Sequence, residues 1–238
     1  MRAPLPVQPS LVDQVVNAIV SEIVDGELPS NTRLIQDDLA RAYGVSRQPV
    51  QQALLLLRNQ GLVREAPGRG LIVSPLEIDF VRNLYEVRAV LEGLAARLAA
   101  EHGTKRAKKE GPARLADGRT AVESGSLSDQ IAADMTFHDF ISELSGNPLI
   151  GETTAPHWPS MRRVMGEVLR EDEEMPKNIW DEHAAILDAV IEADRDRAEN
   201  LSRQHILHAA KVFIDRLQAQ QDASTEDMQR RRSRLIRR

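Results

Sequence analysis

The 238-residue chain contains no cysteine, which excludes disulfide frameworks, thiolate zinc fingers, Cys-x-x-Cys redox motifs and cysteine nucleophiles. Any metal site must therefore use histidine and carboxylate ligands. Aromatic residues are scarce, with two Trp, two Tyr and four Phe, and this balance favours helices over a β-sandwich core. No stretch approaches the roughly 18 apolar residues of a membrane span, and the start, MRAPLPVQPS, lacks the apolar segment of a signal peptide. We expect a cytoplasmic, mainly helical protein with no membrane partner.

The formal net charge of −5 is distributed unevenly along the chain. Residues 1–75 carry seven basic and seven acidic residues, whereas residues 76–228 carry 18 basic and 29 acidic residues. The last ten residues, QRRRSRLIRR, carry six Arg and no acidic residue. The acidic total therefore does not exclude a nucleic-acid partner for the first part. We expect three parts: a module at 1–75, a helical domain at 76–222 and an Arg-rich, disordered tail at 223–238.

The first 75 residues show the pattern of a helix-turn-helix. Apolar residues between Leu11 and Val24 recur at the spacing of one helical face. Further helices are predicted over residues 36–43 and 47–60, and the tight turn Gly44-Val45-Ser46 separates them. Two helices joined by such a turn are typical of a DNA-binding helix-turn-helix.

The third helix and the segment after it carry polar side chains that suit DNA reading. Ser46 is a suitable N-cap, and Arg47 and Gln48 lie in the first helical turn. Both side chains can pair with base edges in the major groove. Residues 62–75 predict two short strands around a glycine-flanked loop, from which Arg69 could reach the minor groove or a phosphate. This order of elements predicts a winged helix-turn-helix that binds DNA.

The stretch GELPSNTRLIQDDLARAYGVSRQPVQQALLLLRNQGLVREAPGRGLIV closely resembles the winged helix-turn-helix of the GntR family of bacterial transcription regulators. The resemblance covers about residues 11–75. The resemblance implies DNA contacts at six positions, which are Arg33, Arg47, Gln48, Gln51, Arg69 and Gly70. We add the cap residue Ser46 to these candidates. The family commonly has Arg where this chain has Gln51, and Pro-Gly where it has Ser30-Asn31. We therefore expect the operator to differ from the commonest family half-site at the base read by position 51.

From residue 76 onward the sequence is almost wholly helix-periodic. One predicted apolar face has Arg88 beside it and comprises Val81, Leu84, Tyr85, Val87, Leu91, Leu94, Ala95 and Leu98. Residues 103–128 carry four Gly and one Pro, which predicts a mobile loop or a broken helix. Later segments bring the total to about six helices with no credible strand, so an antiparallel helical bundle is expected.

Four polar residues in this helical part are candidate metal ligands. Asp134 and His138 are four residues apart, so both side chains project from one helical face. His183 and His205 lie in the apolar stripes of two later segments. A histidine in an apolar stripe is commonly a core residue rather than a ligand. Four such groups aimed at one interior would, however, be costly without a shared partner, which one divalent metal provides.

The helical part resembles the FCD ligand-binding domain of FadR-like members of the family, in LYEVRAVLEGLAARLAA, DMTFHDFISELSGNPLI and EHAAILDAVIEADRDRAENLSRQH. In metal-binding members the ligands are the Asp and His of D-x3-H, the His of E-H-x-x-I and a His 22 residues later. The resemblance therefore implies a metal site of Asp134, His138, His183 and His205. Zn, Ni, Mn and Fe all suit these ligands. His208 is the alternative ligand, and His102 and His157 are expected at the surface.

The open coordination positions of such a site suit a small carboxylate effector, such as a sugar acid or a dicarboxylic acid. The resemblance supports Arg88 as a second contact for that effector. The alternative is a buried ion pair of Arg88 with Glu92 or Glu86. Asn147 is a further candidate contact, or a left-handed residue at a helix C-terminus.

The leading hypothesis is a homodimeric transcription regulator, expected to be a repressor, which binds a near-palindromic operator and responds to a carboxylate metabolite. A second hypothesis is a metalloenzyme-like hydrolase that uses the Asp/His/His/His site. No motif supplies a general base for it, and it leaves the DNA-binding module unexplained. A third is a metal-free regulator that responds to an acyl ligand, as in the subfamily's fatty-acid member. The intact ligand set argues against this third hypothesis.

Overall fold

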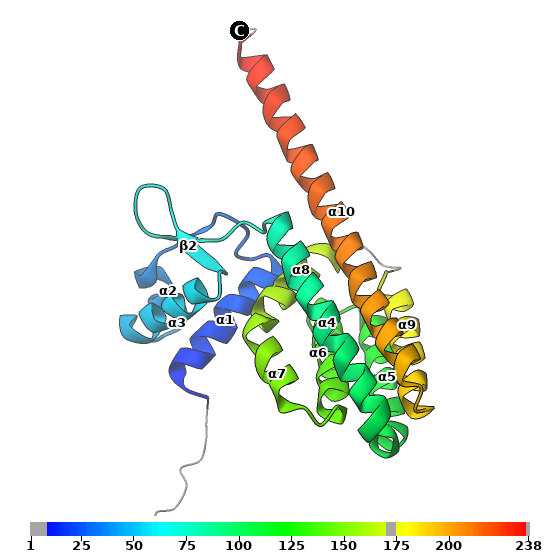
Figure 1. The fold of residues 1–238 in the computed structure, drawn as a ribbon. Helices are drawn as coiled ribbons and strands as arrows, with labels where there is room; N and C mark the ends of the chain where they lie inside the picture. The colour runs from blue at the N-terminus through cyan, green and yellow to red at the C-terminus, as the bar shows by residue number, and fades with distance from the viewer. Residues whose placement is uncertain (1–8, 170–174, 237–238) are drawn as a thin grey trace, which may run out of the picture. The chain divides into compact units, whose positions relative to one another are not determined.

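A computed structural model describes residues 9–169 and 175–236 of the chain (Figure 1). The chain divides into two compact units. The first comprises the first 75 residues together with Pro156–Glu167, and the second comprises the rest. Pro156–Glu167 folds with the first unit, although the sequence placed it within the helical domain at 76–222. No helix in the described part of the chain is long and apolar enough to cross a membrane.

The first unit is a winged helix-turn-helix. Its helices are α1 (Leu11–Asp25), α2 (Gln36–Ala42) and α3 (Arg47–Asn59), and its strands are β1 (Arg33–Leu34), β2 (Val63–Glu65) and β3 (Leu71–Val73). Helix α1 begins with a capping box, in which Ser10 Oγ accepts from the Asp13 N–H and the Asp13 carboxylate accepts from the Ser10 N–H. The apolar faces of α1 and α3 meet in a core that includes Ile19, Val50 and Leu57. The three predicted helices are confirmed.

The wing contains one strand more than the sequence predicted. The sheet is antiparallel with the order β1-β3-β2, and β1 pairs Arg33 with Ile72 and Leu34 with Leu71. A strand of two residues shows no periodicity, so only its pairing with β3 identifies it.

Helix α8 (Trp158–Leu169) begins within the stretch that folds with the first unit. A Cβ atom on Gly166 would lie 2.8 Å from the Val24 carbonyl oxygen, so α8 lies directly against the end of α1. The buried Arg163 donates from Nη2 to Ser30 Oγ at 3.1 Å and to the Ser74 carbonyl oxygen. Burial lowers the pKa of the Arg163 guanidinium. These contacts hold α8 against one end of the wing sheet, where β1 begins and β3 ends.

The second unit is a bundle of α-helices, which confirms the predicted mainly α fold class (Figure 1). Helices α4 and α10 pack along each other, and α5 packs against α6 and α9. The core between them is built from small and aromatic residues, including Ala96, Ala99, Phe137 and Val190. The helices of this unit are α4 (Ile78–His102), α5 (Thr104–Ser124), α6 (Leu127–Leu144), α7 (Pro148–Thr154), α9 (Met175–Ile191) and α10 (Arg195–Ile236). The 3-10 turn η1 (Ala155–His157) lies where the chain changes unit.

The loop or broken helix predicted at residues 103–128 is wrong, because most of this stretch forms helix α5. Its glycines serve packing. A Cβ atom on Gly111 would lie 2.6 Å from the Leu187 methyl groups, and one on Gly118 would lie 2.0 Å from the Trp180 ring. The helix even contains Pro112. Close packing against α9 therefore outweighs the low helix propensity of these residues.

Two further predictions differ from the structure. Helix α10 continues to Ile236, so residues 223–236 are helical rather than a disordered tail, and this stretch has no Gly or Pro to end a helix. Residues 237–238 lie outside the described part of the chain. In α4, Val87 and Leu94 are 57% and 38% exposed, although the sequence placed both on the buried face. Helical spacing indicates the direction of the apolar face but not its width.

Candidate metal centre and nucleic-acid interface

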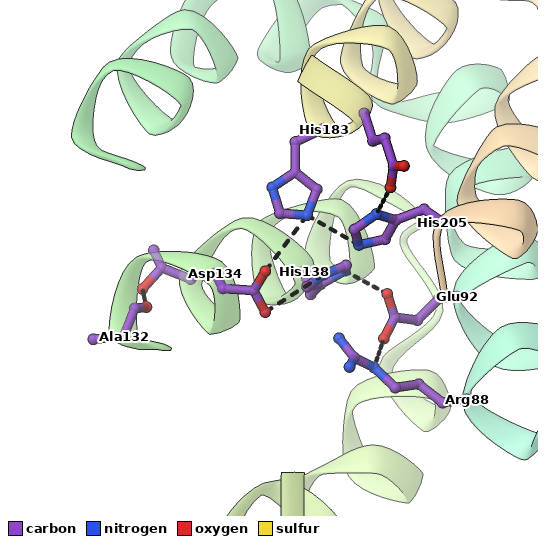
Figure 2. Close-up of polar contacts among 9 residues, drawn as sticks. Arg88, Glu92, Ala132, Asp134, His138, His183 and His205 are labelled. Atoms are coloured by element: carbon purple, nitrogen blue, oxygen red, sulfur yellow. Dashed lines mark hydrogen bonds and ion pairs between the residues drawn. The ribbon is translucent and has the colours of Figure 1, made fainter. Parts of the chain in front are cut away.

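The four candidate ligands come from three helices and meet inside the second unit (Figure 2). Helix α6 places Asp134 and His138 one turn apart, α9 supplies His183, and α10 supplies His205. All four are buried, and one ligand atom from each lies within 4.8 Å of the others. His183 Nε2 is 3.1 Å from His205 Nε2 and 3.6 Å from Asp134 Oδ1. The structure thus brings together all four residues that the sequence singled out.

Two carboxylates outside this cluster hold two of its histidines. His205 Nδ1 lies 2.7 Å from Glu182 Oε2, and His138 Nδ1 contacts Glu92 Oε2. An ionised carboxylate only accepts hydrogen bonds, so the ring nitrogen that faces it carries the proton. The other nitrogen, Nε2, then has its lone pair free on the side of the cluster. Metal-binding histidines commonly have this arrangement.

The pKa shifts favour the protonation states that a metal requires. Burial lowers the pKa of His183 well below its usual value, and burial also lowers that of His205. Burial alone would raise the pKa of Glu92, but Arg88 and His138 outweigh it and hold this pKa at about 2. At neutral pH the two imidazoles are therefore neutral and Glu92 is ionised, which suits metal binding.

The residues fit a divalent ion on the evidence of their own contacts. Among the described residues, the buried His138 Nε2 has no hydrogen-bond partner, although it lies only 3.7 Å from Asp134 Oδ2. His183 Nε2 and His205 Nε2 lie 3.1 Å apart, which is a hydrogen-bond distance in one pair of tautomers, and both nitrogens could instead bind one ion. One oxygen and three nitrogen ligands match the preferences of Zn, Ni, Mn and Fe.

The two predicted effector contacts lie in different surroundings. Arg88, from α4, donates from Nε to Glu92, so the ion pair that the sequence left as an alternative is present beside the cluster (Figure 2). Asn147 caps the start of α7, where its side-chain oxygen accepts from the Leu149 N–H at 3.2 Å. Its φ of −105° shows that the predicted left-handed conformation is wrong, and Gly146 takes that role with φ 70°. Asn147 lines a hollow of about 530 Å³, whose lining includes none of the four ligands.

The predicted DNA-contact side chains at the start of α3 are exposed. Ser46 occupies the N-cap position, but its hydroxyl makes no capping bond, contrary to the predicted role. Arg47 forms a two-point ion pair with Asp37 of α2, at 2.5 Å and 2.7 Å. Gln48 and Gln51 lie exposed on the same helix. The helix N-terminus thus presents two neutral side chains and an Arg that Asp37 holds in place.

The wing places its three candidate residues around one turn. Arg69 has a φ of 136° between Gly68 and Gly70, which are both at positive φ, so the loop depends on glycine flexibility. Arg33, from β1, donates to the Arg69 carbonyl oxygen at 3.0 Å. Arg33 therefore supports the wing loop, and it is also exposed to solvent.

The sequence did not identify Glu182 or assign a metal-site role to Glu92. Glu92 was named only as a possible partner of Arg88, from which it lies one helical turn away. Glu182 directly precedes His183, and adjacent helical residues point in different directions. Its contact with His205 depends on the packing of α9 against α10, so no sequence signal could have indicated it. His102 and His157 are exposed, as expected.

Comparisons with known proteins match a family model to each of the two parts of the chain. Residues 83–208 match the family model of the FCD domain, and residues 11–73 match that of the bacterial regulatory proteins of the gntR family. The HTH-type transcriptional repressor RspR of Escherichia coli K12 is 27% identical over 201 residues, which cover 84% of this chain and 87% of RspR. An uncharacterized HTH-type transcriptional regulator of Agrobacterium vitis, in the TAR-I ttuE-ttuC' intergenic region, is 35% identical over 133 residues, which cover 54% of this chain and 77% of the relative.

Two solved structures share the fold. E. coli McbR/YncC has a TM-score of 0.75 at 22% identity, and covers 88% of this chain and 100% of its own. A putative GntR transcriptional regulator from Rhodococcus sp. RHA1 has a TM-score of 0.72 at 21% identity, and the match covers 86% of this chain and 97% of the Rhodococcus chain. At such identities the likeness concerns the fold alone.

Proposed function

The chain belongs to the GntR family of bacterial regulatory proteins and carries an FCD domain, and from this premise we propose that it is a metal-dependent, metabolite-responsive repressor. It is a DNA-binding transcription regulator and not an enzyme, as its relatives are HTH-type regulators. The name of RspR as a repressor supports the sign of regulation proposed here. A cytoplasmic location follows from DNA as the partner.

The observation that carries the proposal is the buried cluster of Asp134, His138, His183 and His205. A bound divalent ion would supply positive charge and open coordination positions for anionic oxygens. The buried side chains at the site that bear a formal charge are Arg88, Glu92 and Asp134, and their formal charges sum to −1, which disfavours an anion in a buried site. A divalent ion reverses this sign, so we infer that the carboxylate effector binds only to the metal-loaded protein. Arg88 is the proposed effector contact at the metal, whereas a contact with Asn147 would lie in a separate hollow whose lining includes none of the four ligands.

The DNA-binding part of the proposal rests on the exposed side chains of the winged helix-turn-helix. Arg47, Gln48 and Gln51 would read base edges in the major groove, while Ser46 would contact the backbone. The wing loop, with Arg33, Arg69 and Gly70, would contact the minor groove or phosphates. One module reads one half-site, so a near-palindromic operator requires a homodimer.

An exposed apolar strip on α4 supports the homodimer. Phe80, Val87, Val90 and Leu94 are 40%, 57%, 52% and 38% exposed, and their spacing places them within one sector of the helix. Contiguous apolar surface of this kind marks interaction sites, and a C2 dimer would bury the same strip from both copies. We expect Val87→Glu to shift the protein from dimer to monomer in analytical ultracentrifugation.

The test of the proposed function combines metal analysis with DNA binding. The purified protein should contain close to one divalent ion per chain by elemental analysis. In band shifts with DNA from upstream of its own gene, binding should weaken with salt, and candidate carboxylates should release it. Effector coupling of about 1–3 kcal/mol corresponds to a 5- to 150-fold loss of DNA affinity.

The variant Asp134→Ala provides the internal control. It should still bind DNA but should not respond to the carboxylate, because its metal site is incomplete. If the protein shows no specific binding to this DNA at moderate salt, that result would count against its proposed role as a regulator acting there. A metal-free protein whose folding a chelator leaves unchanged would instead favour a regulator that responds to an acyl ligand.

A further inference from the structure

Glu182 uses both oxygens of its carboxylate to connect two histidines of the neighbouring helix. Its Oε2 lies 2.7 Å from His205 Nδ1, and its Oε1 lies 2.7 Å from His208 Nδ1. Glu182 belongs to α9, whereas both histidines belong to α10 and lie three residues apart on one face. The carboxylate is therefore held at both ends and cannot rotate away from His205 without losing one of its partners.

This contact determines what His205 offers to the cluster. Since Glu182 accepts from Nδ1–H, the lone pair of His205 lies on Nε2, the nitrogen that faces His183. The opposite tautomer would present a proton to the cluster and would leave Glu182 Oε2 without a donor from His205. The ring plane is set as well, because a bond of 2.7 Å allows little rotation about the Cβ–Cγ bond.

Glu182 and His208 differ from the four ligands of the cluster in that their side chains are partly exposed to solvent. Glu182 and His208 line a hollow of about 500 Å³, together with Asp181, Gln204 and the outer edge of His205. The Glu182 side chain is 33% exposed and that of His208 is 60% exposed, whereas that of His205 is only 3% exposed. The Glu182 and His208 side chains thus connect the solvent-facing hollow to the buried ligand.

From this geometry we infer that Glu182 is a positioning residue that prepares His205 for metal binding, with His208 holding the second carboxylate oxygen. The inference rests on the proposed metal site. Outer carboxylates of this kind fix the tautomer and raise the basicity of the ligating imidazole, and their loss typically weakens metal affinity by about 10- to 100-fold.

The experiment measures Zn²⁺ affinity of the full chain by competition with a chromophoric chelator. Glu182→Ala should bind Zn²⁺ about 10- to 100-fold more weakly than the natural chain. His208→Ala should lose less, because Glu182 can still accept from His205. The matched control is Asp181→Asn, which removes an equal charge from the same hollow but has no contact with His205 among the interactions described; its affinity should stay unchanged. Glu182→Gln should show an intermediate loss and replaces the Ala variant if that variant does not fold.

A second readout requires no metal. Nitrogen-15 NMR of the histidine rings in metal-free protein should show His205 protonated at Nδ1 in the natural chain and shifted toward the other tautomer in Glu182→Ala. Wild-type affinity in both Glu182 variants, or an equal loss in Asp181→Asn, would overturn the inference. A natural chain that does not bind Zn²⁺ would contradict the proposed metal site instead, and an unchanged His205 tautomer in Glu182→Ala would still overturn the positioning role.

Discussion

Gly118 offers a sharp test of how helix α5 supports the candidate metal centre. In Gly118→Ala, the new Cβ would lie 2.0 Å from the Trp180 ring, which is at least 1 Å closer than real Cβ contacts. The indole is buried and rigid, so it must move as a whole. Overpacking of this kind costs about 1–3 kcal/mol, and the large overlap favours the upper part of this range. Ala is favoured over Gly in a helix by about 1 kcal/mol, so we expect a net loss of about 1–2 kcal/mol.

The displaced ring also reaches the site. The Trp180 and His183 rings meet edge-on with centroids 4.7 Å apart, so a shifted indole disturbs a proposed ligand. Zn²⁺ affinity should therefore fall together with the free energy of unfolding. Urea unfolding followed by CD measures the stability, and chelator competition measures the affinity.

The matched control is Gly111→Ala in the same helix. Its Cβ would meet the terminal methyl groups of Leu187 at 2.6 Å, and a flexible leucine can change rotamer. We expect a stability change close to zero, because the gain in helix propensity offsets a smaller strain. If Gly118→Ala is as stable as the natural chain and binds Zn²⁺ equally well, the argument for close packing of α5 on α9 is refuted.

Three other predictions concern the operator, the first unit and the metal. In an operator selection, Gln51→Arg should change the preferred base pair at one position of each half-site, with a discrimination of about 1–3 kcal/mol between bases. If both proteins select identical operators, residue 51 does not read that base. Arg163→Met should destabilise the first unit by about 1–3 kcal/mol in urea unfolding, because the Ser74 carbonyl loses its donor, whereas Arg162→Met should have little effect. Zn²⁺ at a hundredfold excess over its dissociation constant should stabilise the fold by about 2.7 kcal/mol, and calorimetry with and without chelator measures this difference.

The extent to which the sequence predicted the structure differed between kinds of feature. Helical spacing was sufficient for α1 and α3, because an amphipathic helix repeats its apolar residues over several turns. It failed for β1, which is two residues long, and for α5, where glycines that usually interrupt helices instead allow α9 to approach. Local rules describe what a segment prefers alone, and packing energies of several kcal/mol override them.

For the candidate site, the sequence by itself determined the chemical character of the ligands. With cysteine absent, only histidine and carboxylate remained, and the D-x3-H spacing placed Asp134 and His138 on one face of a helix. Tertiary structure alone decided the distances at which His183 and His205 meet them, and that Glu92 contacts His138 while Glu182 contacts His205. These contacts join residues from separate helices, and their existence depends on the angle and register at which the helices pack, which residue spacing along one helix does not encode.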